Sequence, residues 1–140
     1  MFDDNGVIVD YDSLKSLKTA LRDISNNRYI TEISFALNYS LSGLKPFGYH
    51  LVNNLIHIVN AILVFYLVII TFRTPYFSCQ LSAISYQLSA DSLFFIAFSS
   101  AFIFVAHPIQ TQAVTYLSQR SASMATMFYL MSVVLYVKFR

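Results

Sequence analysis

Three long apolar runs constrain the fold of this chain more than any other feature of its sequence. They extend over residues 51–72, 88–109 and 121–137. A helix needs about 20 apolar residues to cross the hydrocarbon core of a bilayer, and about 17 is the lower limit. Each run is therefore predicted to be a transmembrane helix. The chain is predicted to be an all-α, polytopic membrane protein with three spans, located in the inner or plasma membrane if its source is bacterial.

The composition supports a membrane protein. Hydrophobic residues make up 56% of the 140 residues and charged residues only 11%, whereas soluble domains carry about 25% charged residues. The net charge of +2 is too small to indicate a nucleic-acid partner. The single cysteine, Cys79, excludes an internal disulfide and a cysteine-based zinc site. Membrane lipid is the expected partner.

Two amphipathic helices are predicted to precede the spans. The first covers about residues 14–24, with leucine and isoleucine on one side and lysine and arginine on the other. It either lies flat on the bilayer surface or packs on the bundle as an ordinary surface helix. The second extends from Tyr29 to Leu41 and ends before Gly43. Its apolar stripe consists of Ile30, Ile33, Leu37 and Leu41.

The first apolar run carries a polar stripe. His50, Asn53, Asn54 and His57 follow the spacing i, i+3, i+4 and i+7, so they share one face of a helix, with Asn60 at its edge. Lipid cannot form hydrogen bonds with this face, which is therefore expected to turn toward protein. The asparagines either hold neighbouring helices together or line a site, and His50 favours a site because it lies near the membrane interface.

A second polar cluster follows the second apolar run. Pro108 is predicted to end that helix or to turn it. His107, Gln110, Gln112 and Arg120 are then expected to face a common region between two spans. Ionisable groups at this depth are costly to desolvate, and they commonly serve a function. The cluster is therefore a candidate site.

Several sequence blocks resemble a known family. They are Phe2-Asp3-Asp4, residues 33–39 with Gly43, residues 48–53, and residues 107–116 with Arg120. In this order they resemble the N-terminal membrane part of transferases that carry C-terminal tetratricopeptide repeats. These transferases are grouped with the protein O-mannosyltransferase-like enzymes of the GT-C fold. The resemblance covers nearly the whole chain outside a short tandem repeat at residues 78–90.

The resemblance implies a glycosyltransferase that moves a sugar from a polyprenyl-phosphate carrier to a hydroxyl of a protein Ser or Thr, or of a glycan. An acidic residue in the first extracytoplasmic loop acts as the general base of such enzymes, which by position is Asp3 or Asp4. The residues expected to bind substrate are His50, Asn53, His107, Gln112 and Arg120. Of these, His107 and Arg120 would stabilise the departing phosphate. The lipid-linked sugar is the expected donor. A divalent metal is compatible with this chemistry, although no residue is assigned as its ligand.

The resemblance also implies a topology. Residues 1–49 form an extracytoplasmic loop with amphipathic interfacial helices, and residues 50–140 form a three-span region that is part of a GT-C-like domain. Arg73, Lys138 and Arg140 agree with the positive-inside rule, whereas the basic residues between positions 15 and 45 disagree with it. The family has a transmembrane helix before the acidic pair, and further spans and repeats after this region. The chain is therefore expected to be a fragment that is inactive in isolation.

Two alternatives remain open. One is a non-catalytic membrane fragment. The other is a haem- or metal-binding membrane subunit, because His50, His57 and His107 all lie in or beside predicted spans and paired imidazoles can ligate such groups.

Overall fold

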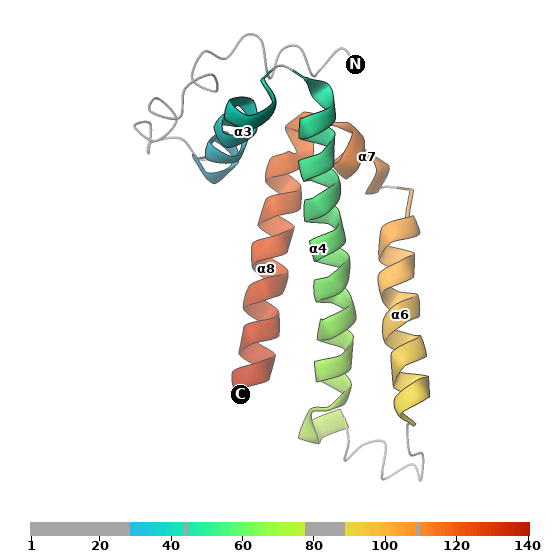
Figure 1. Cartoon of the computed structure of the whole chain (residues 1–140). Coiled ribbons are helices and arrows are strands. Elements are labelled where there is room, and N and C mark those ends of the chain that lie inside the picture. Colours follow the sequence, from blue (N-terminus) through green and yellow to red (C-terminus); the bar gives the residue numbers. More distant parts are fainter. Residues whose placement is uncertain (1–28, 44, 78–88, 109) are drawn as a thin grey trace. The chain divides into compact units, whose positions relative to one another are not determined.

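The computed structural model describes residues 29–43, 45–77, 89–108 and 110–140, and the elements in these ranges are helices (Figure 1). The long helices are α3 (Tyr29–Ser42), α4 (Pro46–Phe72), α6 (Ala90–Ala106) and α8 (Arg120–Phe139). The short ones are α7 (Gln110–Thr115) and the 3₁₀ helix η2 (Leu117–Gln119). The described ranges contain no strand, which confirms the all-α class. The predicted helix at residues 14–24 lies outside them.

Local signals in the sequence set the helix ends. Gly43 stops α3 in the left-handed conformation, at φ 59°, and its N–H donates to the carbonyl of Tyr39 at 2.8 Å. Pro46 is the first residue of α4, where a helix has no need of its missing N–H. Ser89 caps α6 by accepting the N–H of Ser92 at 3.1 Å.

The end of α6 confirms the prediction made from Pro108. His107 leaves the helix with φ −65° and ψ 128°. A residue before proline is restricted to this extended region by a clash with the proline ring. The chain therefore breaks between α6 and α7 at the proline that the sequence indicated.

Two of the described helices are long and apolar enough to cross a membrane, namely Pro46–Phe72 and the continuous helical segment Leu117–Phe139. The helix that matches the second predicted span, α6, has 17 residues. At 1.5 Å per residue it is about 25 Å long, somewhat less than the roughly 30 Å thickness of a hydrocarbon core. Two spans therefore have support from length and composition, and the third remains a prediction.

The chain divides into two compact units, Met1–His57 with Thr111–Met124, and Ile58–Gln110 with Ala125–Arg140. In the first unit α3 lies beside the beginning of α4 (Figure 1), and the buried core consists of Phe35, Tyr49 and Leu117. Gly48 allows the close approach of α3 to α4, because a Cβ at this position would overlap the side chain of Ser42.

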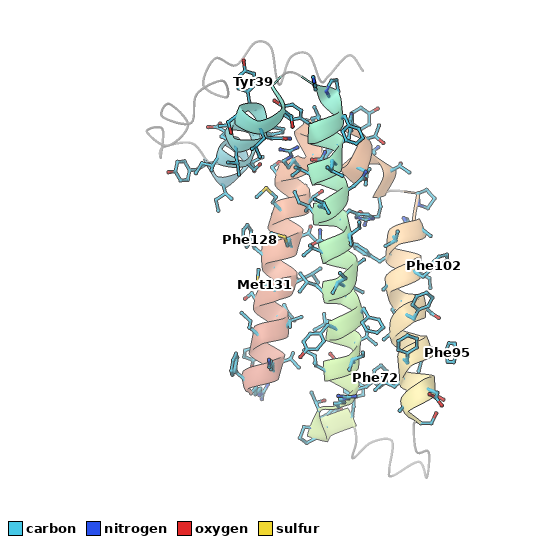
Figure 2. The ribbon with its side chains drawn as sticks, viewed as in Figure 1. Tyr39, Phe72, Phe95, Phe102, Phe128 and Met131 are labelled. Carbon is cyan, nitrogen blue, oxygen red and sulfur yellow. The ribbon has the colours of Figure 1, made fainter. Side chains whose placement is uncertain are left out.

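The second unit is rich in aromatic contacts. Phe65 of α4 meets Phe94 of α6 edge to face, with ring centroids 5.7 Å apart. Along α6, the ring of Phe98 stacks on those of Phe94 and Phe102 at 6.2 and 6.4 Å. Phe95 and Phe102 lie on the side of α6 that points away from α4 (Figure 2), and both are exposed. This outer face suits contact with lipid.

The apolar stripe predicted for α3 exists, but it does not face the core. Ile30, Leu37 and Leu41 are 55%, 52% and 79% exposed. The face of α3 that packs on the first unit carries Thr31, Phe35, Ala36 and Asn38 instead. The stripe is thus an outward apolar surface, as an interfacial helix requires, although contact with lipid remains a prediction.

Candidate functional site

Arg120, the first residue of α8, is fully buried in the first unit and lies at the centre of a polar cluster. Its Nε donates to Oδ1 of Asn53 at 2.7 Å, and its Nη2 donates to the backbone carbonyl of Tyr49 at 2.9 Å. The pair joins residues 67 positions apart in the sequence. Arg120 therefore ties the beginning of α8 to the beginning of α4.

Aromatic rings complete the surroundings of the guanidinium. Its central carbon lies 4.1 Å from the ring centroid of Phe35 and 5.8 Å from that of Tyr49. A cation over an aromatic face is attracted to the negative face of the ring. The Tyr49 hydroxyl donates to the carbonyl of Gly43 at 3.0 Å. The cluster thus connects α3, the turn after it, α4 and α8.

Some hydrogen-bond donors of this cluster have no acceptor among the described residues. Both hydrogen bonds of Arg120 end on uncharged oxygens. Within the part of the chain that the structure describes, Nη1 of Arg120 and Nδ2 of Asn53 are buried and have no hydrogen-bond partner. An arginine has five N–H donors and no acceptor. The cluster is therefore suited to an acceptor group, above all one with a negative charge.

The polar stripe of α4 is only partly as predicted. Asn53 and His57 are buried, and His50 is half-buried. Asn54 is exposed, so its prediction was wrong, whereas Asn60 is 2% exposed. Residues 53, 57 and 60 follow the spacing i, i+4 and i+7, so they share one face of α4. This buried face differs from the predicted one because it includes Asn60 and leaves out Asn54.

The predicted substrate-binding residues do not all fall in one described cluster. His50 lies within 3.5 Å of the Val114 carbonyl through its Nδ1, which brings α4 beside α7. Gln112 also lies on α7 and is exposed. His107 is exposed and belongs to the second unit, so its grouping with Arg120 remains a prediction.

The two acidic residues predicted to be catalytic, Asp3 and Asp4, lie outside the described residues. Within the described ranges, no group of three or more His, Cys, Asp and Glu residues is placed to hold a metal ion. The metal alternative therefore gains no support from this part of the chain.

Phe35, Asn38 and Tyr49 belong to the sequence blocks that resemble the transferase family, but the sequence alone predicts no role for them. The structure places all three in the buried part of the first unit, and Phe35 and Tyr49 directly beside Arg120. The feature that these three residues share in the sequence is that they belong to the two blocks on either side of the turn at Gly43.

Comparison with known proteins finds similarity to several proteins named protein O-mannosyl-transferase. The chain is 36% identical over 113 residues to a protein O-mannosyl-transferase of Caenorhabditis elegans, which is 81% of this chain and 14% of that protein. It is 34% identical over 116 residues to the protein O-mannosyl-transferase Tmtc3 of Drosophila melanogaster, covering 79% of the chain and 12% of the relative. The mouse protein O-mannosyl-transferase TMTC2 is 32% identical over 111 residues.

The chain is thus similar, over about four fifths of its length, to proteins named protein O-mannosyl-transferase. This confirms the family resemblance seen in the sequence blocks. The chain spans about one seventh of the worm protein and about one eighth of the fly protein. No family model and no solved structure matches it.

Proposed function

We propose that this chain is part of a membrane glycosyltransferase that moves mannose from a polyprenyl-phosphate carrier to a hydroxyl group, that of a protein Ser or Thr in the first instance. The observation that carries the proposal is the similarity, over about four fifths of the chain, to proteins named protein O-mannosyl-transferase. The apolar helices α4 and α8 support a membrane location, where a polyprenyl carrier resides.

The reaction is a substitution at the anomeric carbon of the sugar. The acceptor oxygen forms a bond to this carbon, and the bond from the carbon to the phosphate oxygen breaks. The electron pair leaves with the polyprenyl phosphate, and a carboxylate takes the proton of the acceptor hydroxyl. Asp3 or Asp4 supplies this carboxylate in the proposed mechanism, because these residues form the acidic pair of the family block.

The departing phosphate gains negative charge as the bond breaks, so donors aimed at it lower the barrier. Arg120 is suited to this role because its guanidinium is held by Asn53 and by the Tyr49 carbonyl. A side chain that is already oriented loses little freedom when it binds. In this proposal His107 assists Arg120 at the phosphate, and His50, Asn53 and Gln112 contact the substrate.

We propose three transmembrane helices, of which α6 is the shortest. A helix of this length can span if the bilayer thins locally or if flanking residues extend to the interface, at a modest free-energy cost. Residues 1–49 and the segment that contains α7 then lie on the extracytoplasmic side, and Lys138 and Arg140 lie on the cytoplasmic side. The protein is accordingly multi-pass.

A chimera tests the proposal. The segment of the worm protein O-mannosyl-transferase that matches this chain is replaced by the chain, and transfer is measured from radiolabelled polyprenyl-phosphate mannose to a Ser- and Thr-containing peptide. We expect transfer by the chimera. Asp3→Asn or Asp4→Asn should lower the rate about 100- to 10,000-fold, one of them far more than the other, because only one carboxylate can reach the acceptor hydroxyl.

The matched control for the acidic pair is Asp91→Asn, in the first turn of α6, which should leave transfer nearly unchanged. His107→Ala and Arg120→Ala should slow transfer. Gln112→Ala should have a smaller effect, because a neutral amide forms a weaker bond to an anion than a charged donor does. Near-full activity of both Asp3→Asn and Asp4→Asn would contradict the assigned base. The unaltered worm protein is measured in the same assay. If it transfers mannose and the folded, membrane-inserted chimera does not, the proposal is wrong.

A further inference from the structure

The outward side of α8 carries small and polar residues where a helix that contacts only lipid carries large apolar ones. Val134 is 6% exposed and marks the side of α8 that packs on the second unit. On the opposite side of the helix, Ala125, Tyr129, Ser132 and Tyr136 are exposed. We call these four residues the outer row. Because lipid cannot form hydrogen bonds with their hydroxyl groups, the outer row indicates a protein partner.

The spacing of the outer row is that of a seam between two helices. Its members follow one another at intervals of four, three and four residues, which is the a and d pattern of helices that wind around each other. Small residues allow membrane helices to approach closely, and hydroxyl groups form hydrogen bonds between them. Side chains on a helix lean toward the preceding turn, so the rings of Tyr129 and Tyr136 lie at the levels of Ala125 and Ser132. The small residues therefore leave space for the rings of a facing helix.

Tyr129 lies too deep in the proposed span for its hydroxyl to reach water. It is 69% exposed, and ten residues separate it from Phe139, the nearer end of the apolar segment Leu117–Phe139. At 1.5 Å per residue this distance is about 15 Å, which is longer than a tyrosine side chain. A hydroxyl in hydrocarbon without a hydrogen bond is costly. The Tyr129 hydroxyl therefore needs a polar partner inside the membrane.

A second copy of this chain supplies polar groups at the required depth. Two copies inserted in the same orientation place residues of the same number at the same depth, so each hydroxyl of the outer row meets its own counterpart. A hydroxyl both donates and accepts, and the two Tyr129 side chains are therefore complementary across a two-fold axis. Among the described residues, α6 offers a single exposed hydroxyl between Phe94 and Val105, that of Ser99. That helix does not match the row.

We infer that the outer row of α8 is a self-association surface, through which two copies of the chain form a parallel, two-fold symmetric dimer in the membrane. The two Tyr129 hydroxyls form a hydrogen bond across the axis, and the tyrosine rings pack beside Ala125 and Ser132 of the other copy. The inference rests on the membrane location of α8, which the proposed function also uses, and not on sugar transfer. Loss of transfer in the chimera therefore does not contradict it.

Disulfide cross-linking tests the surface. The full chain with Cys79→Ser is reconstituted into phosphatidylcholine vesicles, and Ser132→Cys supplies a single cysteine. We expect oxidation to produce a covalent dimer, because the two-fold axis brings the two copies of position 132 together. Ser99→Cys is the matched control, since it places a cysteine on an exposed position of α6, and this variant should stay monomeric.

The outcomes separate the inference from the proposed function. An inserted chain that stays monomeric with Ser132→Cys would overturn the inference and would leave the outer row to another helix of a longer protein. Equal cross-linking of Ser132→Cys and Ser99→Cys would also overturn it, because random collision gives that result. A chain that alkaline washing removes from the vesicles would contradict both the inference and the membrane location in the proposed function.

Tyr129→Phe tests the hydrogen bond itself. Copies labelled with donor or acceptor dyes at Cys79 are mixed in vesicles, and energy transfer is followed as lipid is added. We expect Tyr129→Phe to weaken dimerisation about 3- to 20-fold, the range for hydrogen bonds between membrane helices. Tyr66→Phe on α4 is the matched control, because Tyr66 is also exposed, at 39%. It should change the affinity by no more than about twofold. Equal effects of the two variants would show that the inference is wrong.

Discussion

Replacing Asn53 by leucine tests how strongly the Arg120–Asn53 pair stabilises the first unit. Leucine has the same number and branching of side-chain heavy atoms as asparagine but lacks the oxygen that lies 2.7 Å from Arg120 Nε. A hydrogen bond to a charged group contributes about 1.5–3 kcal/mol, whereas neutral side-chain pairs between membrane helices average about 0.6 kcal/mol. Because Arg120 is charged and fully buried, the larger value applies. We expect Asn53→Leu to lower the free energy of unfolding by about 2–3 kcal/mol.

A double-mutant cycle isolates the pair. Arg120→Met leaves the oxygens of Asn53 and Tyr49 without their donor, and the double variant Asn53→Leu with Arg120→Met removes both partners of the pair. Loss of both partners costs less than the sum of the single losses when the two groups interact. We expect a coupling energy of at least about 1.5 kcal/mol. The assay is unfolding by SDS in dodecyl maltoside micelles, followed by circular dichroism.

The control for this cycle is Asn54→Leu, on the exposed side of α4, which should change stability by no more than about 0.5 kcal/mol. A coupling energy below about 0.5 kcal/mol, or equal effects of Asn53→Leu and Asn54→Leu, would show that Asn53 and Arg120 do not stabilise each other, because distant and independent sites behave in this way.

Two further predictions concern the frame around the site. Gly48→Ala should lower the free energy of unfolding by about 1–3 kcal/mol, because the new methyl group overlaps Ser42. Ser42→Gly in the same chain should recover most of the loss. An unchanged unfolding midpoint in Gly48→Ala would show that α3 and α4 do not approach as described. Cysteines placed at Asn5 and at Thr115, in a chain with Cys79→Ser, should react with a membrane-impermeant maleimide from the same side of the bilayer, and labelling from opposite sides would separate the acidic pair from the segment that contains α7.

The helix ends could be predicted from sequence because local chemistry sets them. Gly43 ends α3 through its backbone conformation and Pro108 ends α6 through a clash, and neither needs a distant partner. The end of α4 at Phe72 also agrees with the sequence, since Arg73 follows it. The beginning of α4 lies at Pro46, before the apolar run at Leu51, because a helix can extend beyond the part that lipid covers.

The side chains of the site were harder to predict. Periodicity identified a polar face on α4, but it could not decide between Asn54 and Asn60 at the edges of that face, because packing partners settle this. The same limit applies to α3, whose apolar stripe points outward while Phe35 points to the core. Contact between Asn53 and Arg120 depends on how α4 meets α8, and no local pattern encodes it.

We propose above that a protein containing this chain takes its sugar from a polyprenyl phosphate. The most direct measurement is the amount of polyprenyl phosphate released for each mannose that the chimera with the worm protein attaches to a peptide. We expect one released polyprenyl phosphate per transferred mannose, because the same bond breaks in both events. Mannosylation without release of polyprenyl phosphate, or release without mannosylation of any hydroxyl acceptor, would contradict it.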